Sequence, residues 1–261
     1  MSLNVTLGSV IRSEWLKFRT VRSSITGVLV TFILTIGLGA LVTSLLRAHW
    51  DTTDAARRLT FDPVATSLVG IIFAQFAIGV IGSLFITSEY SSGSIRTTLA
   101  AVPNRVQLVF GKMIVLVTSM FVVCEVACFI AFLMGQAIFS GVVPTASLSN
   151  GTVLRAVIFA GVYLTLLSAL AFSLGLILRQ SAATISGFVS ILLVLPLILA
   201  FLPSSWQDAA MRYLPNEMGH AMTSITPVAH DFGAWSALIV LFIYVVALFG
   251  VATTMMSRRD A

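Results

Sequence analysis

The chain has 261 residues, of which 58% are apolar and only 10% are charged, and its net charge is +5. A soluble domain carries charged side chains at roughly a quarter of its positions, so this composition excludes a water-soluble enzyme or binding domain. The deficit is concentrated in six windows that together hold 141 residues and one charged side chain, Glu125.

Each window has at least the ~20 residues that a helix needs to cross a hydrocarbon layer. The windows are uninterrupted apolar runs, without the alternation that is typical of a membrane-spanning β-barrel strand. The sequence therefore predicts an all-α integral membrane protein, with a single transmembrane domain over residues 1–261 and six transmembrane helices. The predicted spans are 24–46, 63–88, 113–139, 156–178, 184–203 and 235–256.

Residues 1–23 precede the first span and contain an amphipathic pattern. Apolar side chains recur at helical spacing at Leu7, Ile11, Trp15 and Phe18, while basic and polar residues take the other faces. Such a helix is predicted to lie flat at the membrane interface. It either anchors the first span only, or forms a structural elbow that couples to a cytoplasmic partner.

The distribution of Lys and Arg predicts the orientation. With the N-terminus in the cytoplasm, ten of the fifteen basic residues lie on the cytoplasmic side of the spans and five on the other side. Basic loops are retained in the cytoplasm, so both termini are predicted to be cytoplasmic in a plasma or inner membrane. The positive net charge then reflects topology and does not indicate nucleic-acid binding.

The connection over residues 89–112 is the longest one on the predicted cytoplasmic side. Three apolar residues spaced i, i+4 and i+7 predict a short helix with one apolar stripe: Ile95, Leu99 and Val102. Pro103 is expected to end this helix, and Asn104 with Gln107 resembles a cap that starts the next one. We expect a stiff helix–break–helix segment. Its apolar side chains would form a protruding knob on which a soluble partner can exert force.

Glu125 is predicted to lie near the membrane midplane, about twelve residues into the third span. Thr118 and Gln136 fall within about 40° of it on the same helix, and Gln75 lies at a similar depth in the second span. A Gln75–Glu125 hydrogen bond is therefore expected. We interpret these residues as an interhelical polar clamp; the alternative is a polar lining of a transport pathway or a proton-linked site.

The last part of the chain is predicted to include a kinked span and an external amphipathic segment. Pro196 should kink the fifth span because it removes a backbone hydrogen bond. Residues 204–234 contain apolar side chains at intervals of three or four, and Pro215 and Pro227 divide the segment. One or two short helices are expected there, resting on the outer leaflet or partly re-entering it.

Signatures of catalytic chemistry are missing from the sequence. Gly111-Lys112 ends like a phosphate-binding loop, but the Gly required six residues before the Lys is Val106. No metalloprotease or serine-hydrolase motif occurs. We expect a non-catalytic chain that holds no metal or cofactor.

Residues of the 89–112 loop resemble the loop after the second span of type-2 ABC transporter permeases, the exporter class. The matching positions are Glu89, Gly93, Ser94, Ile95, Arg96, Leu99, Pro103, Arg105, Gly111 and Lys112. The segments Glu14-Trp15-Leu16-Lys17 and Tyr213-Leu214-Pro215-Asn216, with Gly219, are also similar to that family.

The resemblance implies a permease subunit of an exporter that moves a drug, peptide, lipid or ion out of the cell. Two copies of a separate cytoplasmic ATPase would bind ATP and Mg²⁺, and a second permease, identical or related, would complete the complex. The loop would supply the coupling helix, with seven residues facing the ATPase: Glu89, Gly93, Ile95, Arg96, Leu99, Pro103 and Arg105.

Two other functions remain open at this point. The first is a stand-alone secondary carrier that couples to an ion gradient through Glu125, and the second is a membrane scaffold without transport. A carrier more often has interrupted spans and several buried charges, whereas the predicted spans hold one acid and no base. The loop pattern therefore favours the exporter.

Overall fold

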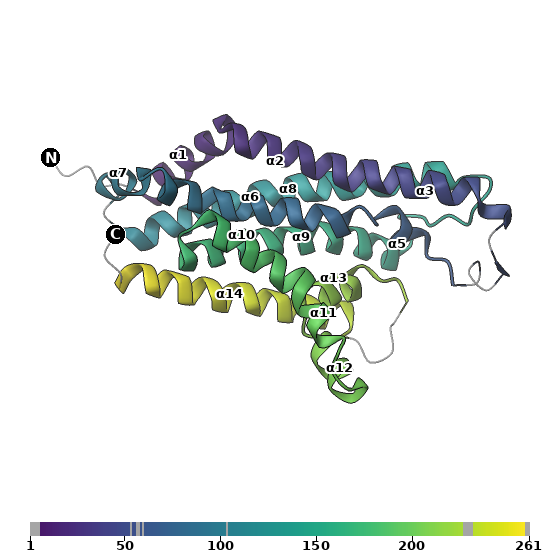
Figure 1. Cartoon of the computed structure of the whole chain (residues 1–261). Coiled ribbons are helices and arrows are strands. Elements are labelled where there is room, and N and C mark those ends of the chain that lie inside the picture. Colours follow the sequence, from purple (N-terminus) through teal and green to yellow (C-terminus); the bar gives the residue numbers. More distant parts are fainter. Residues whose placement is uncertain are drawn as a thin grey trace.

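The computed structural model describes residues 6–258 apart from 53, 56, 57, 59, 103 and 227–231. The described residues form helices and no strand (Figure 1), which confirms the predicted all-α class. The elements in chain order are α1 (Leu7–Thr20), α2 (Arg22–Phe32), the π-helix η1 (Ile33–Gly37), α3 (Leu38–Ala48), the 3-10 turn η2 (Trp50–Thr52), α5 (Pro63–Ser67), α6 (Ile71–Ser91), α7 (Ser94–Ala101), α8 (Arg105–Phe139), α9 (Gly151–Leu178), α10 (Ser181–Val189), the π-helix η3 (Ser190–Val194), α11 (Leu195–Leu199), α12 (Ser204–Met211), α13 (Pro215–Thr223) and α14 (Ala234–Arg258).

Six stretches of helix within the described residues are long and apolar enough to cross a membrane, as the sequence predicts. The third of them, α8, is longer than expected and runs for 35 residues from Arg105 to Phe139. Gly111 and Lys112, which were assigned to the loop, therefore lie inside this helix. The helix thus extends without interruption from the short α7 to the opposite end of the bundle.

Three predicted spans are irregular, and the first of them, 24–46, contains the π-helix η1. The window 63–88 is divided into α5 and α6 by a turn at residues 68–70, and the Asp62 carboxylate caps α5 by accepting from the backbone N–H groups of Val64 and Ala65. In the fifth span, the irregular segment is the π-helix η3, directly before the turn that contains Pro196. A proline leaves a carbonyl of the preceding turn without its N–H partner, and a wider turn is one way a helix adapts.

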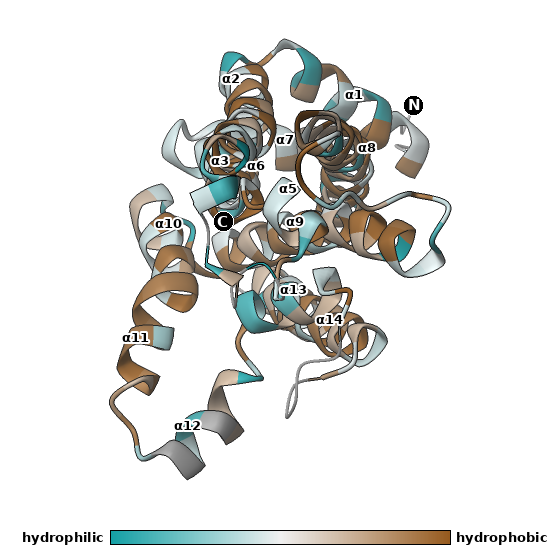
Figure 2. Ribbon diagram, turned by 90° about the vertical axis from the view of Figure 1, so that its right-hand side faces the viewer, coloured by the Kyte–Doolittle hydropathy of each residue, from teal (hydrophilic) through white to brown (hydrophobic). Residues whose placement is uncertain are grey.

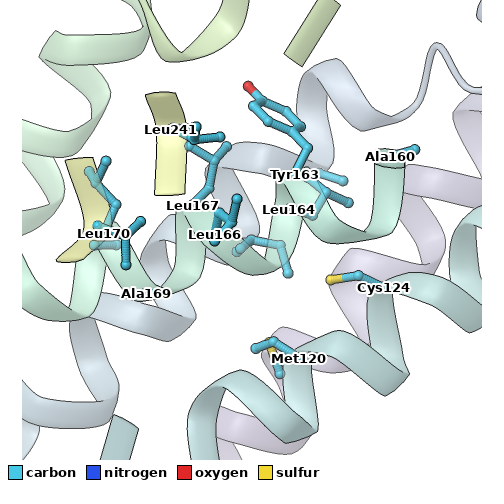
Figure 3. Close-up of a cluster of buried hydrophobic side chains, with 14 of the residues drawn as sticks. Met120, Cys124, Ala160, Tyr163, Leu164, Leu166, Leu167, Ala169, Leu170 and Leu241 are labelled. Carbon is cyan, nitrogen blue, oxygen red and sulfur yellow. The ribbon is translucent and has the colours of Figure 1, made fainter. Parts of the chain in front are cut away.

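The core of the bundle is built around α9. Most of its apolar window, 78%, is buried inside the protein, whereas only 17% of the first and of the fifth span is buried. Figure 3 shows the leucines of α9 packed beside Met120 and Cys124 of α8 and Leu241 of α14. Cys124 and Cys128 are buried free thiols that pack in this core.

Several segments that are distant in sequence meet at one end of the bundle. α1, α7, the start of α8 and the end of α14 lie together at the left of Figure 1, and this is called the α7 end below. α5 lies toward the opposite end. The elbow helix α1 turns Val10, Glu14 and Phe18 into the protein, while Leu7 and Trp15 of the predicted apolar stripe stay exposed.

The segment after the fifth span forms two short helices, α12 and α13, as expected. The methionines of α13, which belong to the predicted apolar pattern of this segment, turn toward the protein core. Met218 and Met222 have no exposed surface and belong to the main core. Pro215 opens α13 at a position where a missing N–H costs nothing, and Pro227 lies outside the described residues.

Candidate functional site

Four charged side chains from three helices meet at the α7 end. Two come from α1, one from α6 and one from α8: Glu14, Lys17, Glu89 and Lys112. The Nζ atom of Lys112 lies 2.7 Å from a Glu14 oxygen and 2.7 Å from Glu89 Oε1. The Nζ atom of Lys17 lies 2.8 Å from the other Glu14 oxygen and 3.0 Å from Glu89 Oε1. The group is called the ion cluster below.

Most of the ion cluster is withdrawn from solvent. The side chains of Glu14 and Lys112 are 1% exposed and that of Glu89 is 12% exposed, while Lys17 stays 41% exposed at the rim. Two acids and two bases leave no net charge, and the ring of Phe85 lies 5.5 Å from the Lys112 ammonium. Charges buried in this way are tolerated only while every partner remains. The ion cluster therefore fastens α1, α6 and α8 together.

The pKa of Lys17 reflects these contacts. Burial alone would lower the pKa, but the hydrogen bonds and charges of Glu14 and then Glu89 outweigh it and raise the pKa above its ordinary value. A lysine with a raised pKa contributes stability below its unfolded-state pKa and loses that contribution as the pH rises through the folded-state value. Lys17 therefore keeps its charge at neutral pH.

The short helix α7 projects from this cluster. Gly93 precedes it with φ +70°, in the left-handed region that a glycine adopts without strain. Asn104 caps the following helix by accepting a hydrogen bond from the Gln107 backbone N–H at 3.1 Å, as predicted. Pro103, which was expected to end α7, lies outside the described residues. The turn before α7 thus depends on a glycine, and the long helix α8 that follows α7 begins at a side-chain cap.

The apolar stripe of α7 does not form the predicted knob. Ile95 is only 5% exposed, and Leu99 packs against the main core. The helix instead presents Arg96, Thr97 and Ala100 outward. The i, i+4 pattern correctly identified an apolar face, but that face anchors α7 to the bundle.

Arg105 forms a further contact at this end. Its guanidinium donates a hydrogen bond to the backbone carbonyl of Met256, 3.3 Å away, and so joins the start of α8 to the end of α14. Of the loop residues proposed to face a partner, Arg96 is exposed, Glu89 lies in the ion cluster, and Ile95, Leu99 and Arg105 make internal contacts. The α7 end is therefore one mechanically connected unit.

The polar residues inside the spans are arranged differently from the prediction. The prediction of a Gln75–Glu125 hydrogen bond is wrong. The side-chain carbonyl of Gln75 instead accepts a hydrogen bond from the Tyr163 hydroxyl, 2.7 Å away. The Glu125 carboxylate occupies the space above Gly161 of α9, where an added Cβ would lie 2.6 Å from its carboxyl carbon. Both of its oxygens are buried without a hydrogen-bond donor among the described residues.

Thr118 and Gln136 do not join Glu125. Thr118 is exposed and donates only to a carbonyl of its own helix. Gln136 donates to Ser67 Oγ at 2.9 Å and accepts from the Ala146 backbone N–H at 2.7 Å. It therefore ties the end of α8 to α5 and to the connection that precedes α9.

Replacing Gln136 by Leu is expected to destabilise the protein by about 1–3 kcal/mol, because buried groups of α5 and of the connection lose their partner. Thr118→Val provides the matched control, since it removes a hydroxyl that bonds only its own helix, and should change the stability by less than ~0.5 kcal/mol. Thermal unfolding of both variants in non-ionic detergent tests this. Equal melting temperatures would show that the Gln136 contacts contribute nothing.

Sequence reasoning did not recognise the ion cluster as a site. Glu14, Lys17 and Lys112 entered only as parts of motifs, and no pairing between them was predicted. The available signal was a charged residue inside a largely apolar helix, since Lys112 lies seven residues after Arg105 and thirteen before Glu125, the other two charged residues of α8. Such a residue needs a counter-ion.

Comparison with known protein families identifies the class of protein to which the chain is similar. The model of the ABC-2 family transporter proteins matches residues 10–202, which is 193 of the 261 residues of the chain. The matched region includes the ion cluster, α7 and Glu125. No curated protein matches the chain.

Proposed function

The chain belongs to the ABC-2 family of transporter membrane proteins, and we propose that it is the permease subunit of an ATP-binding cassette exporter. In this proposal a separate ATPase binds at the α7 end, holds ATP and Mg²⁺, and drives a substrate out of the cytoplasm. Two ATPase copies would serve two permeases, either two copies of this chain or this chain and a related one.

The observation that supports this proposal most is the way α7 is mounted. α7 is a short helix with an outward polar face, and it follows directly on the helix that carries Glu89 of the ion cluster. Because α1, α6 and α8 are joined there by buried ion pairs, a force applied to α7 is transmitted to several spans rather than absorbed locally. Such a rigid mounting suits a helix on which a soluble motor acts.

The predicted orientation agrees with this assignment. The positive-inside bias assigns the α7 end to the cytoplasm, where an ATPase has access to ATP. Gly111-Lys112 does not complete a phosphate-binding loop, because Val106 takes the place of the required glycine. The proposal therefore assigns ATP hydrolysis to a separate ATPase chain.

Charge reversal on α7 tests the proposal. Arg96→Glu should reduce the amount of ATPase that co-purifies with the tagged chain about tenfold, because an exposed basic residue at the contact becomes repulsive. Arg12→Glu is the matched control, since Arg12 is an exposed arginine of α1, and it should retain the ATPase. The measurement is quantitative mass spectrometry of the complex extracted from the native host in mild detergent.

Two outcomes would contradict the proposal. One is the recovery of the chain without any ATPase while transport continues under an ion gradient and is abolished by Glu125→Gln, which is the result expected for a secondary carrier. The other is equal ATPase recovery with Arg96→Glu and with the unaltered chain. The second outcome would show that α7 does not contact the ATPase.

A further inference from the structure

A half-open cavity of about 520 Å³ lies at the α7 end, between the helices α1, α2, α6 and α7. Its volume is in the range of pockets that hold small organic molecules. Figure 2, which looks along the bundle from the opposite end, shows these four helices grouped in the upper part of the molecule. The ion cluster forms part of the wall through Glu14, Lys17 and Glu89. The ion pairs explain these three residues, but they do not explain the open space beside them.

The lining of the cavity changes from polar to apolar along α6. From the end of this helix inward, the lining residues are Ser92, Glu89 and Ser88, followed by Phe85, Leu84, Ile81 and Val80. At 1.5 Å per residue, the polar part spans about 6 Å and the apolar part roughly a further 12 Å. The start of α2 has the same order, since Ser23 and Ser24 come before Gly27. Two helices therefore give the cavity one polar end and one apolar end.

This change in polarity matches the profile of one bilayer leaflet. The headgroup region on each side of a bilayer is roughly 5–8 Å thick, because a total thickness of ~40–45 Å includes a hydrocarbon core of ~30 Å. The predicted second span ends at Ser88, so the polar end of the cavity lies at the depth of the headgroups and the apolar end at the depth of the acyl chains. A molecule that fills the cavity therefore needs a polar and an apolar part, in the orientation of a lipid of the cytoplasmic leaflet.

The polar end of the cavity is also its open end. The exposed lining residues all lie there: Val21, Ser23, Ser88, Ser92 and Thr97. At the apolar end α2 and α6 pack closely, because a Cβ added at Gly27 would lie 2.5 Å from Ile81 Cγ1. The cavity is therefore accessible at the level of the headgroups, and the contact between α2 and α6 limits its depth to the head and the first part of one acyl chain.

The charges at the polar end do not select a charged occupant. The two acids and two bases of the ion cluster are paired with one another at 2.7–3.0 Å. The hydroxyls of Ser88, Ser92 and Thr97 donate to backbone carbonyls nearby in the chain, and each of these oxygens can still accept a hydrogen bond. The ammonium of Lys17 has three protons and two carboxylate contacts, so it can still donate. The polar end therefore offers both donors and acceptors to a headgroup.

From these features we propose that the cavity binds one phospholipid of the cytoplasmic leaflet. Its headgroup lies among the hydroxyls at the open end, and the first part of one acyl chain contacts Val80, Leu84 and Phe85. The rest of the lipid stays in the bilayer. Because α1, α2, α6 and α7 all line the cavity, the bound lipid fills the joint between the elbow helix and α7. This inference goes beyond the proposed function and does not depend on the ATPase or on the transported substrate.

The binding experiment uses the full chain in non-ionic detergent and two lipid probes, phosphatidylethanolamine and phosphatidylglycerol with the same acyl chains. After extensive washing, mass spectrometry should find a stoichiometric amount of either lipid on the chain, in similar amounts because the charges of the lining are paired. Each lipid should also raise the melting temperature, since it binds the folded chain. Glycerophosphoethanolamine, which has the same headgroup and no acyl chain, should not raise it.

Two pairs of variants locate the bound lipid. Val80→Trp fills the apolar end and should reduce lipid retention about tenfold, because the acyl chain loses its contacts. Val122→Trp is the matched control, since Val122 of α8 is 60% exposed and lies outside the lining. Ser23→Trp obstructs the open end and should reduce retention several-fold, while Ser13→Trp changes an exposed serine of α1 outside the lining. The serine pair decides the matter should Val80→Trp fail to fold.

Three outcomes would overturn the proposal. The first is a washed chain that retains detergent and no phospholipid. The second is equal retention by each cavity variant and its control. The third is a preference of about tenfold or more for phosphatidylglycerol, which would show that an anion binds at Lys17 and that the amphipathic shape of the cavity does not select the occupant. Because no ATPase is present, such a failure leaves the coupling at α7 unaffected, and a failure to capture the ATPase leaves the lipid site unaffected.

Discussion

Replacing Lys112 by Met is expected to destabilise the protein by about 3–5 kcal/mol, because it removes one partner of a buried ion pair. Lys112 is 1% exposed and lies 2.7 Å from both Glu14 and Glu89. Without its ammonium, these two buried carboxylates are left with only the rim residue Lys17. The apolar volume of Met fills the space of the lysine chain, so the loss is electrostatic rather than a loss of packing.

The measurement is the unfolding free energy, or the melting temperature, in non-ionic detergent. Arg12→Met removes an exposed base from α1 and should change the stability by less than ~0.5 kcal/mol. Combining Glu14→Gln with Lys112→Met should cost less than the sum of the two single changes, since the second change removes a charge that the first left unpaired. Additive effects, or a Lys112 variant as stable as the Arg12 variant, would show that the ion cluster is not a coupled unit.

The spans could be predicted because charge depletion along the chain is a one-dimensional signal. Local capping was also predictable, since Asn104 and Gln107 are three residues apart and the hydrogen bond between them needs no tertiary contact. The breaks within spans were harder to predict from the sequence, because the turn between α5 and α6 lies in a window as apolar as the unbroken spans. Hydropathy reports that a segment is buried in lipid, and it does not report its backbone geometry.

The contacts between helices could not be derived from the sequence. Depth along a span gives the height of a residue in the membrane, but not the direction in which its side chain points. Gln75 and Glu125 were placed at a similar depth, yet Gln75 meets Tyr163 of α9. The pairing of Glu14 with Lys112 joins residues 98 positions apart. The apolar stripe of α7 likewise defined a face without showing that the face turns inward.

Gly219→Ala is expected to destabilise the protein by about 2–6 kcal/mol through the ring of Tyr163. A Cβ at position 219 would lie 2.5 Å from Tyr163 Cζ and less than 3 Å from both Cε atoms, a separation that real atoms do not adopt. The ring is only 3% exposed, so it has no free space to move into, and overpacking of this kind costs about 1–3 kcal/mol. Displacement of the ring also breaks the hydrogen bond to Gln75 and leaves a buried amide unsatisfied, which adds about 1–3 kcal/mol.

Gly250→Ala separates the steric effect from the general effect of replacing a helical glycine. Nothing lies within 4 Å of a Cβ built at Gly250 in α14, so this change should be neutral or stabilise the helix by up to ~1 kcal/mol. Truncating Tyr163 to Ala in the Gly219→Ala background should recover part of the lost stability, because the clash then disappears. If Gly219→Ala melts like Gly250→Ala, α13 can move away from α9.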